Sequence, residues 1–270
     1  MNTRQMTDLH GRIALVTGAA GLIGRAHCEA LADAGATVIA CDLDQHAATA
    51  AVEHLGASHQ GIALNITDAA AVHRICDHVL ERHGRIDILV NNAAINDMVE
   101  QPSLDVDVSQ FEHFPIAMWR RVLDVNVTGM FLCCQIIGAT MAQRQSGSII
   151  NIASTYGIVA PDQSLYRAPD GTQRFYKSAA YPVSKAAVIM LTKYLATYWG
   201  HRNVRVNTLS PGGVANGQEP FFVEQYERRT PLGRMATVND YQGALIYLAG
   251  DASSYMTGHN LVVDGGWTAW

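Results

Sequence analysis

Short apolar runs alternate with longer amphipathic stretches along almost the whole chain. The runs predict buried strands, and the stretches between them carry apolar residues at helical spacing. We expect strands over residues 13–17, 37–41, 62–64, 86–90, 148–153, 204–209 and 260–263, and the main helices over residues 23–34, 68–83, 118–141, 181–197 and 239–249. This alternation predicts a parallel sheet with right-handed crossovers and helices on both faces. The fold class is therefore α/β, a doubly wound sheet of about seven strands in one domain over residues 1–270.

A glycine-rich turn follows the first predicted strand. Gly18, Gly21 and Gly24 lie between that strand and the first helix, which Leu22 and Ile23 open. Glycines there let the backbone bend sharply and approach a pyrophosphate, while the first amides of the helix attract negative charge. The position between a first strand and a first helix favours dinucleotide binding and a Rossmann-type domain over a glycine turn without a ligand.

An aspartate ends the second predicted strand. Asp42 lies eighteen positions after Gly24, where a carboxylate can accept hydrogen bonds from both hydroxyls of an adenosine ribose. The same charge repels a 2′-phosphate. We therefore predict NAD rather than NADP as the cofactor.

Tyr181 and Lys185 are four residues apart at the start of a predicted helix, and Pro182 is compatible with its first turn. Side chains at this spacing share one helix face. An ammonium group beside a phenol favours the phenolate, so we expect the pKa of Tyr181 to fall from about 10 towards neutrality. Tyr181 is then a candidate general acid and base. Such pairs also occur by chance on solvated helix faces, so the choice depends on the other motifs.

Composition argues against several classes of protein. The net charge is −5 and the basic residues are scattered, so no nucleic acid partner is indicated. Residues 1–11 have no apolar core typical of a signal peptide, and no long uncharged apolar run predicts a membrane span. Five cysteines without Cys-x-x-Cys spacing suit reduced thiols in the cytoplasm. Eleven histidines in no ligand pattern are expected at the surface, so no metal site is predicted.

Further motifs extend over nearly the whole chain. They are Asn91-Asn-Ala-Ala94, Asp124 to Gly129, Ser154 at the end of the fifth strand, Pro211-Gly212 and Val263 to Gly266. Together with the glycine turn and the Tyr181/Lys185 pair, they resemble the short-chain dehydrogenase/reductase family over residues 12–267.

The resemblance implies a catalytic set. Tyr181 would exchange a proton with the substrate hydroxyl, and Lys185 would lower its pKa and hold the nicotinamide ribose. Ser154 would orient the substrate oxygen, and Asn126 would hold a water that connects Lys185 to solvent. The long helix and the Tyr181 helix would form the four-helix interface of a homodimer or homotetramer.

The resemblance also implies a cofactor site with several departures from the family pattern. Its expected residues are Gly18, Gly21, Leu22, Ile23, Gly24, Asp42, Asn65, Ile66, Asn92, Ala93, Ala94, Tyr181, Lys185, Pro211, Gly212 and Val214. Gly21 comes one position early, and Ala94 replaces the usual glycine. Asn65 replaces the usual aspartate beside the adenine, where its amide oxygen can still accept a hydrogen bond. Asn216 stands where a threonine is usual, and the sequence leaves open whether it replaces that contact.

An insertion separates Ser154 from Tyr181, because the gap of 27 residues exceeds that of most family members. Residues 161–177 hold the additional polar and turn-rich segment. Its cations and aromatic rings suit a cover over a polar substrate, and a hairpin in a subunit contact is an equal alternative. These side chains are Tyr166, Arg167, Arg174, Phe175, Tyr176 and Lys177.

Three other segments have open roles. An acidic connection with Glu100, Asp105, Asp107 and Glu112 either borders the substrate or is a solvated excursion. Residues 213–236 are expected to form a small substrate lobe. The apolar tail over residues 267–270 suggests docking on a neighbouring subunit or on the active site.

These observations predict an NAD-dependent oxidoreductase that interconverts a secondary alcohol and a ketone by hydride transfer. A polar small-molecule substrate such as a sugar, polyol or sugar acid is expected. The alternatives are a 3-oxoacyl thioester reductase, which would use NADPH, and a non-catalytic NAD-binding sensor.

Overall fold

Seven parallel strands form the centre of the molecule, in the order β3-β2-β1-β4-β5-β6-β7. The structure is a computed structural model and describes residues 2–97 and 106–270. The strands are β1 (Ile13–Thr17), β2 (Thr37–Asp42), β3 (Gln60–Ala63), β4 (Ile88–Asn91), β5 (Gly147–Ile152), β6 (Val204–Pro211) and β7 (Asn260–Val263). The doubly wound sheet predicted from the alternation is therefore confirmed, and the first and last residues of each strand lie within two residues of the predicted positions.

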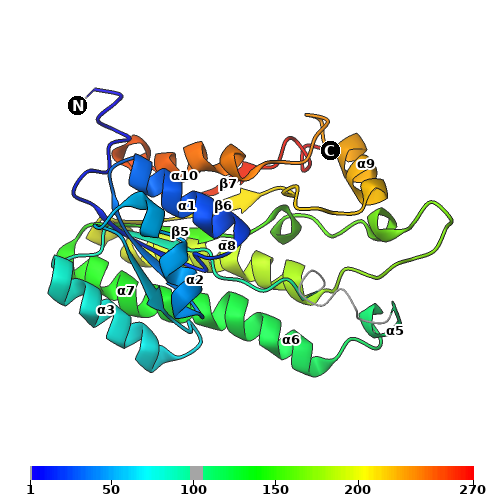
Figure 1. The fold of residues 1–270 in the computed structure, drawn as a ribbon, viewed down its shortest axis with the longest axis horizontal. Coiled ribbons are helices and arrows are strands. Elements are labelled where there is room, and N and C mark those ends of the chain that lie inside the picture. The colour runs from blue at the N-terminus through cyan, green and yellow to red at the C-terminus, as the bar shows by residue number, and fades with distance from the viewer. Residues whose placement is uncertain (1, 98–105) are drawn as a thin grey trace.

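Helices cover both faces of this sheet (Figure 1). The α-helices of the described residues are α1 (Leu22–Asp33), α2 (Gln45–Ala50), α3 (Ala69–His83), α5 (Val106–Ser109), α6 (Ile116–Leu123), α7 (Met130–Arg144), α8 (Ala180–Trp199), α9 (Pro220–Arg229) and α10 (Gln242–Ala249). Helices α1 and α10 pack on one face, and α3, α7 and α8 pack on the other.

Alternate residues of the central strands define the two halves of the core. Leu89 of β4 lies in register between Leu15 and Ile149, and all three pack with α3, α7 and α8. The next residue along β4, Val90, faces α1 and α10 instead. Burying each such side chain contributes roughly 1.5–3 kcal/mol. The same register aligns the carboxyl ends of all the strands at one edge, where ligands bind in open α/β sheets.

The predicted long helix is interrupted by a π-helical segment, Asp124–Gly129, between α6 and α7. The whole helical run Ile116–Arg144 has 29 residues and is long and apolar enough to cross a membrane, which the sequence alone did not indicate. Half of its most apolar window is buried inside the protein. Its α7 part lies in the sheet core, where a Cβ on Gly138 would come within 2.6 Å of the Trp199 ring. Close packing of this kind is typical of a core helix.

A smaller hydrophobic cluster joins the insertion to the lobe around α9. Tyr166 of the insertion stacks on Phe222 of α9, with ring centroids 5.5 Å apart. Tyr226 of α9 stacks on Trp267 of the C-terminal segment at 4.2 Å. Insertion, lobe and C-terminal segment therefore pack as one unit, while the last residue, Trp270, is 80% exposed.

Candidate active site

The glycine turn after β1 has the geometry that dinucleotide binding requires. Gly18 has φ +64°, and a Cβ there would lie 2.6 Å from Cα of Ala93. A Cβ on Gly24 would lie 2.1 Å from the carbonyl oxygen of Gly18. Gly21 is the N-cap of α1 and supplies no side-chain cap, which leaves the first amides of this helix to an anion. The turn therefore fits a pyrophosphate.

The end of β4 is fastened to this turn. The Thr17 hydroxyl oxygen accepts hydrogen bonds from the backbone N–H groups of Asn92 and Ala93, each at 3.1 Å. The Asn92 side-chain amide in turn donates to the carbonyl oxygens of Thr17 and Gly18, at 3.1 and 2.9 Å. Asn92 and Ala93 thus lie beside the glycine turn, and their expected contact with the cofactor stays a prediction.

Asp42 and Asn65 lie at the carboxyl ends of the neighbouring strands, and both already have partners. One Asp42 carboxylate oxygen accepts from the Ala20 N–H at 2.9 Å, and the other accepts from its own neighbour Leu43 at 2.8 Å. Asn65 Oδ1 accepts from the N–H and hydroxyl of Thr67, at 3.1 and 2.9 Å. Asp42 therefore supports the shifted glycine turn in addition to its predicted contact with the ribose.

The remaining expected cofactor residues lie around the same edge. Gly212 follows β6. Its N–H donates to the carbonyl oxygen of Val263, and its own carbonyl oxygen accepts from the Tyr241 hydroxyl at 3.0 Å. Val214 pairs with Ala236 in an isolated bridge. Ile66 differs, because it lies in the core, where a Cβ on Gly129 would come within 2.7 Å of its side chain.

Tyr181 and Lys185 lie in the first two turns of α8, facing the end of β5. Lys185 is 2% exposed, and its ammonium group donates a 2.8 Å hydrogen bond to the carbonyl oxygen of Ile152. The Lys185 Nζ atom is 5.6 Å from the centroid of the Tyr181 ring. The structure thus brings the two side chains together as the helical spacing predicted.

The expected fall in the pKa of Tyr181 is wrong for this structure. Burial raises the pKa of Tyr181 to about 12, and a hydrogen bond with Ser154 only partly opposes this rise. Burial also lowers the pKa of Lys185 to about 8, since it disfavours the charged ammonium form. Desolvation, which spacing along a helix cannot reveal, therefore dominates the attraction between the phenol and the ammonium group.

Ser154, at the end of β5, completes the candidate catalytic set. It is 8% exposed and caps a short 3-10 turn, where its hydroxyl oxygen accepts from the Tyr156 N–H at 3.2 Å. Its hydrogen bond with Tyr181 places the two hydroxyls side by side.

Asn126 lies in the π-helical segment, a type of distortion that is frequent at functional sites. Its side chain accepts from the Ile95 N–H at 2.8 Å and donates to the Ile95 carbonyl oxygen at 3.0 Å. It also donates to the Ser184 hydroxyl at 3.0 Å. Asn126 therefore fixes the segment after β4 against α8, and the water expected beside Lys185 stays a prediction.

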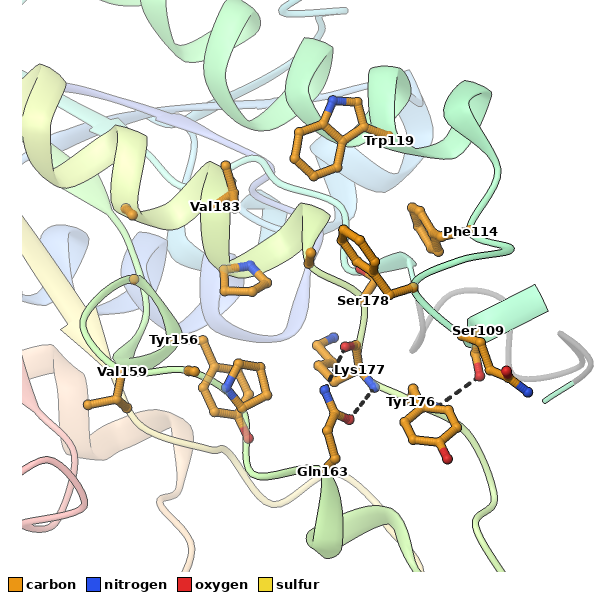
Figure 2. A pocket seen from close by; sticks show the side chains of 18 of the residues that line it. Ser109, Phe114, Trp119, Tyr156, Val159, Gln163, Tyr176, Lys177, Ser178 and Val183 are labelled. Carbon is orange, nitrogen blue, oxygen red and sulfur yellow. Dashed lines mark hydrogen bonds between the residues drawn. The ribbon is translucent and has the colours of Figure 1, made fainter. Parts of the chain in front are cut away.

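A cavity of about 1040 Å³ opens beside this set, between the insertion, the start of α6 and the start of α8 (Figure 2). Its wall includes Tyr156 and Ser178, which are close in sequence to Ser154 and Tyr181, although neither of these two candidate catalytic residues lines it. From the insertion, Gln163, Tyr176 and Lys177 face this space.

The other side chains expected to cover a substrate lie elsewhere. Tyr166 is buried and packs against Phe175, with their ring centroids 4.6 Å apart, so both belong to the small hydrophobic cluster of the lobe. Arg167 is exposed and donates to Gln173. Of the acidic connection, Glu112 lines the cavity and Asp107 accepts from Gln110, while Glu100 and Asp105 lie outside the described residues.

Sequence reasoning missed two buried polar side chains: Asp97, which acts electrostatically on Tyr181, and Ser178, three residues before Tyr181. Asp97 is 4% exposed, and neither of its carboxylate oxygens has a hydrogen-bond partner in the described part of the chain. Ser178 is also 4% exposed, and its hydroxyl is likewise unpartnered there. No motif marks either residue. Within residues 2–97 and 106–270, no three His, Cys, Asp or Glu side chains gather as metal ligands.

Known proteins resemble this chain over its full length. A family model described as enoyl-(acyl carrier protein) reductase matches residues 18–268. D-threitol dehydrogenase of Mycolicibacterium smegmatis is 36% identical, over 96% of this chain and 94% of that protein. Galactitol 2-dehydrogenase (L-tagatose-forming) of Cereibacter sphaeroides is 35% identical, over 100% of both chains. A 3-oxoacyl-(acyl-carrier-protein) reductase of Thermotoga maritima is 34% identical, over 96% of this chain and 98% of that protein.

Solved structures agree with these relatives. A gluconate 5-dehydrogenase from Burkholderia cenocepacia, in complex with NADP and tartrate, superposes with a TM-score of 0.86 at 29% identity, over 100% of both chains. A short-chain dehydrogenase from Leptospira borgpetersenii with bound NAD+ gives a TM-score of 0.85 at 30% identity, over 99% of this chain and 96% of that one. With its glycine turn, its Ser, Tyr and Lys set and its seven-stranded sheet, the chain belongs to the short-chain dehydrogenase/reductase family.

Proposed function

We propose that this protein is an NAD-dependent oxidoreductase that interconverts a secondary alcohol and a ketone on a polyol, sugar or sugar acid. The observation that carries the proposal is the convergence of Ser154, Tyr181 and Lys185 at the edge of the sheet that holds the glycine turn. A non-catalytic NAD sensor would have no need of a buried phenol that is hydrogen-bonded to a serine.

The residues of this chain suit proton transfer at the substrate oxygen. A bound nicotinamide supplies the hydride exchange with the reacting carbon, and Gly18, Asp42 and Asn92 would hold its dinucleotide. Because burial raises the pKa of Tyr181 to about 12, the phenol is protonated at neutral pH and can donate to a ketone oxygen. Alcohol oxidation requires the reverse transfer, in which Tyr181 accepts the hydroxyl proton. Ser154 fixes the substrate oxygen through a second hydrogen bond.

A polar substrate is supported by the chemistry around the catalytic set. Asp97, Lys177 and Ser178 are buried polar side chains near Tyr181, and such groups favour ligands that can form hydrogen bonds with them. Relatives described as dehydrogenases of threitol and galactitol support the same substrate class.

NAD is proposed over NADP because of Asp42. Its carboxylate lies at the end of β2, against the glycine turn through the Ala20 N–H. The charge there would repel a 2′-phosphate and leave the ribose hydroxyls of NAD as partners.

A 3-oxoacyl thioester reductase is the second candidate, because a relative with that description is 34% identical. It would use NADPH, which Asp42 disfavours. Its substrate would also need an apolar acyl site, for which the cavity beside α6 offers Phe114, Ile116 and Trp119.

Several exposed apolar side chains of α8 suit a homodimer or homotetramer. Met190, Tyr194 and Tyr198 are 58–63% exposed and lie along the solvent side of this helix. We propose a cytoplasmic oligomer, in keeping with five buried and unpaired cysteines.

The test is a substrate screen with matched variants. The purified protein is assayed with NAD and NADP against polyols, sugars and aldonates, and with NADH and NADPH against an acetoacetyl thioester. Turnover of polyols with NAD supports the proposal, and Tyr181→Phe should retain less than about a hundredth of it, as expected for loss of a general acid and base. Thioester reduction without polyol oxidation would instead establish the second candidate.

A further inference from the structure

Asp97 lies in the segment that connects β4 to the catalytic set. Two hydrogen bonds fix the backbone of Ile95, two residues before Asp97: its N–H donates to Asn126 Oδ1, and its carbonyl oxygen accepts from Asn126 Nδ2. The next residue, Asn96, accepts a hydrogen bond from Lys177 Nζ, and this ammonium group lies 4.8 Å from the centroid of the Tyr181 ring. The segment over residues 95–97 is therefore held directly beside the catalytic phenol.

The Asp97 carboxyl group is buried without the partners that a structural role requires. It is 4% exposed, and both its oxygens lack a hydrogen bond in the part of the chain that the structure describes. Leaving such a group unpaired is costly, so buried polar groups are normally satisfied. Its negative charge acts on Tyr181, whose pKa it helps to raise. The carboxyl group thus lies within electrostatic reach of the phenol that would exchange a proton with the substrate.

Ser178 and Lys177 add polar groups of complementary chemistry just before Tyr181 in the chain. Ser178 has an unpartnered hydroxyl that is 4% exposed, and it lines the cavity beside the catalytic set. The backbone of Lys177 is fixed by two hydrogen bonds with the Gln163 side chain, at 2.8 and 3.0 Å (Figure 2). A carboxyl group and an ammonium group therefore lie near the phenol, and the Ser178 hydroxyl belongs to a residue that lines the same cavity as Lys177. Aliphatic alcohols with one hydroxyl would leave the acceptor and the hydroxyl unsatisfied.

We propose that Asp97, assisted by Ser178, binds a hydroxyl group on the carbon next to the reacting carbinol, and thereby selects vicinal diols and polyols over simple secondary alcohols. This inference rests on the proposed function and extends it, since it names the residue that recognises a second hydroxyl group of the substrate. A carboxylate oxygen accepts from the neighbouring hydroxyl, while Ser154 and Tyr181 bind the reacting oxygen. The insertion has a defined part in this arrangement, because it ends in Lys177 and leads directly into Ser178.

The test compares three alcohols of four carbons that carry four, two and one hydroxyl groups: D-threitol, 2,3-butanediol and 2-butanol. The kcat/KM of each is measured with NAD for the wild type, Asp97→Asn and Ser178→Ala. Asp33→Asn is the control, because Asp33 is exposed at the far end of α1. Thermal midpoints are measured for every variant.

We expect Asp97→Asn to lower kcat/KM for threitol and butanediol by about tenfold or more, as for a lost hydrogen bond to a charged group. The kcat/KM of Asp97→Asn for 2-butanol should stay within about threefold of the wild-type value. Ser178→Ala should also lower kcat/KM for threitol and butanediol more than for 2-butanol, but by a smaller factor than Asp97→Asn. A second measurement avoids turnover, because it uses the Tyr181→Phe protein with bound NADH. Calorimetry measures the affinity of this protein for threitol, which should be lower in the double variant that also carries Asp97→Asn.

Other results would overturn the inference. If Asp97→Asn lowers kcat/KM for all three alcohols alike, or leaves kcat/KM for threitol unchanged, Asp97 does not bind a neighbouring hydroxyl group. The proposed function would still stand. If the wild-type protein oxidises no polyol at all, the proposed function fails first, and the inference falls with it.

Discussion

The ammonium nitrogen of Lys185 lies 5.6 Å from the centre of the Tyr181 ring and points to a backbone carbonyl oxygen of β5. The two groups are thus close without forming a direct hydrogen bond within the described structure. Because burial dominates at both, the pKa of Tyr181 is raised to about 12 and that of Lys185 is lowered to about 8. The phenol is protonated and the ammonium group is largely charged at neutral pH.

The first prediction is therefore an asymmetry between the two directions of reaction. Oxidation needs deprotonated Tyr181, so its kcat/KM should rise by up to about tenfold per pH unit between pH 6 and 8. The rise should weaken above about pH 8, where Lys185 loses its proton. Reduction needs protonated Tyr181 and should be nearly independent of pH over this range. Initial rates in both directions would check this, and an oxidative plateau below pH 7 would contradict it.

The second prediction concerns cofactor choice at Asp42. Asp42→Asn removes the negative charge but keeps an oxygen that can accept from the Ala20 N–H. We expect the ratio of kcat/KM for NADP over NAD to rise about tenfold, because one like-charge repulsion against the 2′-phosphate is lost. Asp44→Asn is the matched control, since Asp44 lies two positions away and caps α2 through the Ala47 N–H. An equal change in both variants, or a wild type that prefers NADP, would contradict the assignment.

The sequence predicted the sheet well because burial and strand periodicity are local properties. Leu15 and Leu89 stand in runs whose apolar character alone indicates a strand buried on both faces. The spacing of Tyr181 and Lys185 likewise follows from helix geometry. These features depend on residues close together in the chain.

Other properties of the site depend on which distant segments pack together. The rise in the pKa of Tyr181 comes from desolvation by surrounding elements. Tyr166 resembles a substrate-binding aromatic residue in sequence, yet it stacks on Phe222 of α9. Asp97 belongs to no motif, and only the fold places it beside α8. Sequence reasoning could predict which side chains form the candidate catalytic set but not the groups that surround them.

The third prediction concerns the attachment of the insertion to the lobe. Arg229 of α9 pairs with Asp162 at 2.9 Å and donates to the Ser164 hydroxyl at 2.9 Å, both in the insertion. Arg229→Ala should loosen the segment that leads to Lys177, so KM for a polyol should rise about three- to tenfold, as expected when about one charged hydrogen bond is lost.

Arg228→Ala is the matched control for this variant. Arg228 is the neighbouring residue and pairs only with Glu224 on its own exposed helix face within the described structure. Pairs of that kind contribute about 0.3–0.5 kcal/mol, so kinetics should be unchanged. If Arg229→Ala alters kcat but not KM, the insertion acts on the chemical step rather than on substrate binding.

The last prediction concerns His27, which is fully buried in α1, contrary to the expectation that the histidines lie at the surface. Neither ring nitrogen has a hydrogen-bond partner in the described part of the chain, and burial lowers the pKa of His27 to about 4. The unfolded chain takes up a proton at this position below its ordinary pKa of 6.5, whereas the native state does so only near 4. The free energy of unfolding should therefore fall with decreasing pH across this window, by roughly 3 kcal/mol in all from this residue.

Urea unfolding of the wild type and His27→Leu between pH 4 and 7.5 measures how much His27 contributes to the pH dependence of the free energy of unfolding. The variant removes two unpaired polar atoms at similar volume, so it should be at least as stable as the wild type at pH 5. The difference between the two proteins should grow as the pH falls from 6.5 to 4. His73→Gln, at an exposed position of α3, should follow the wild-type curve. Parallel curves for wild type and His27→Leu would mean that the native state protonates His27 as readily as the unfolded chain does.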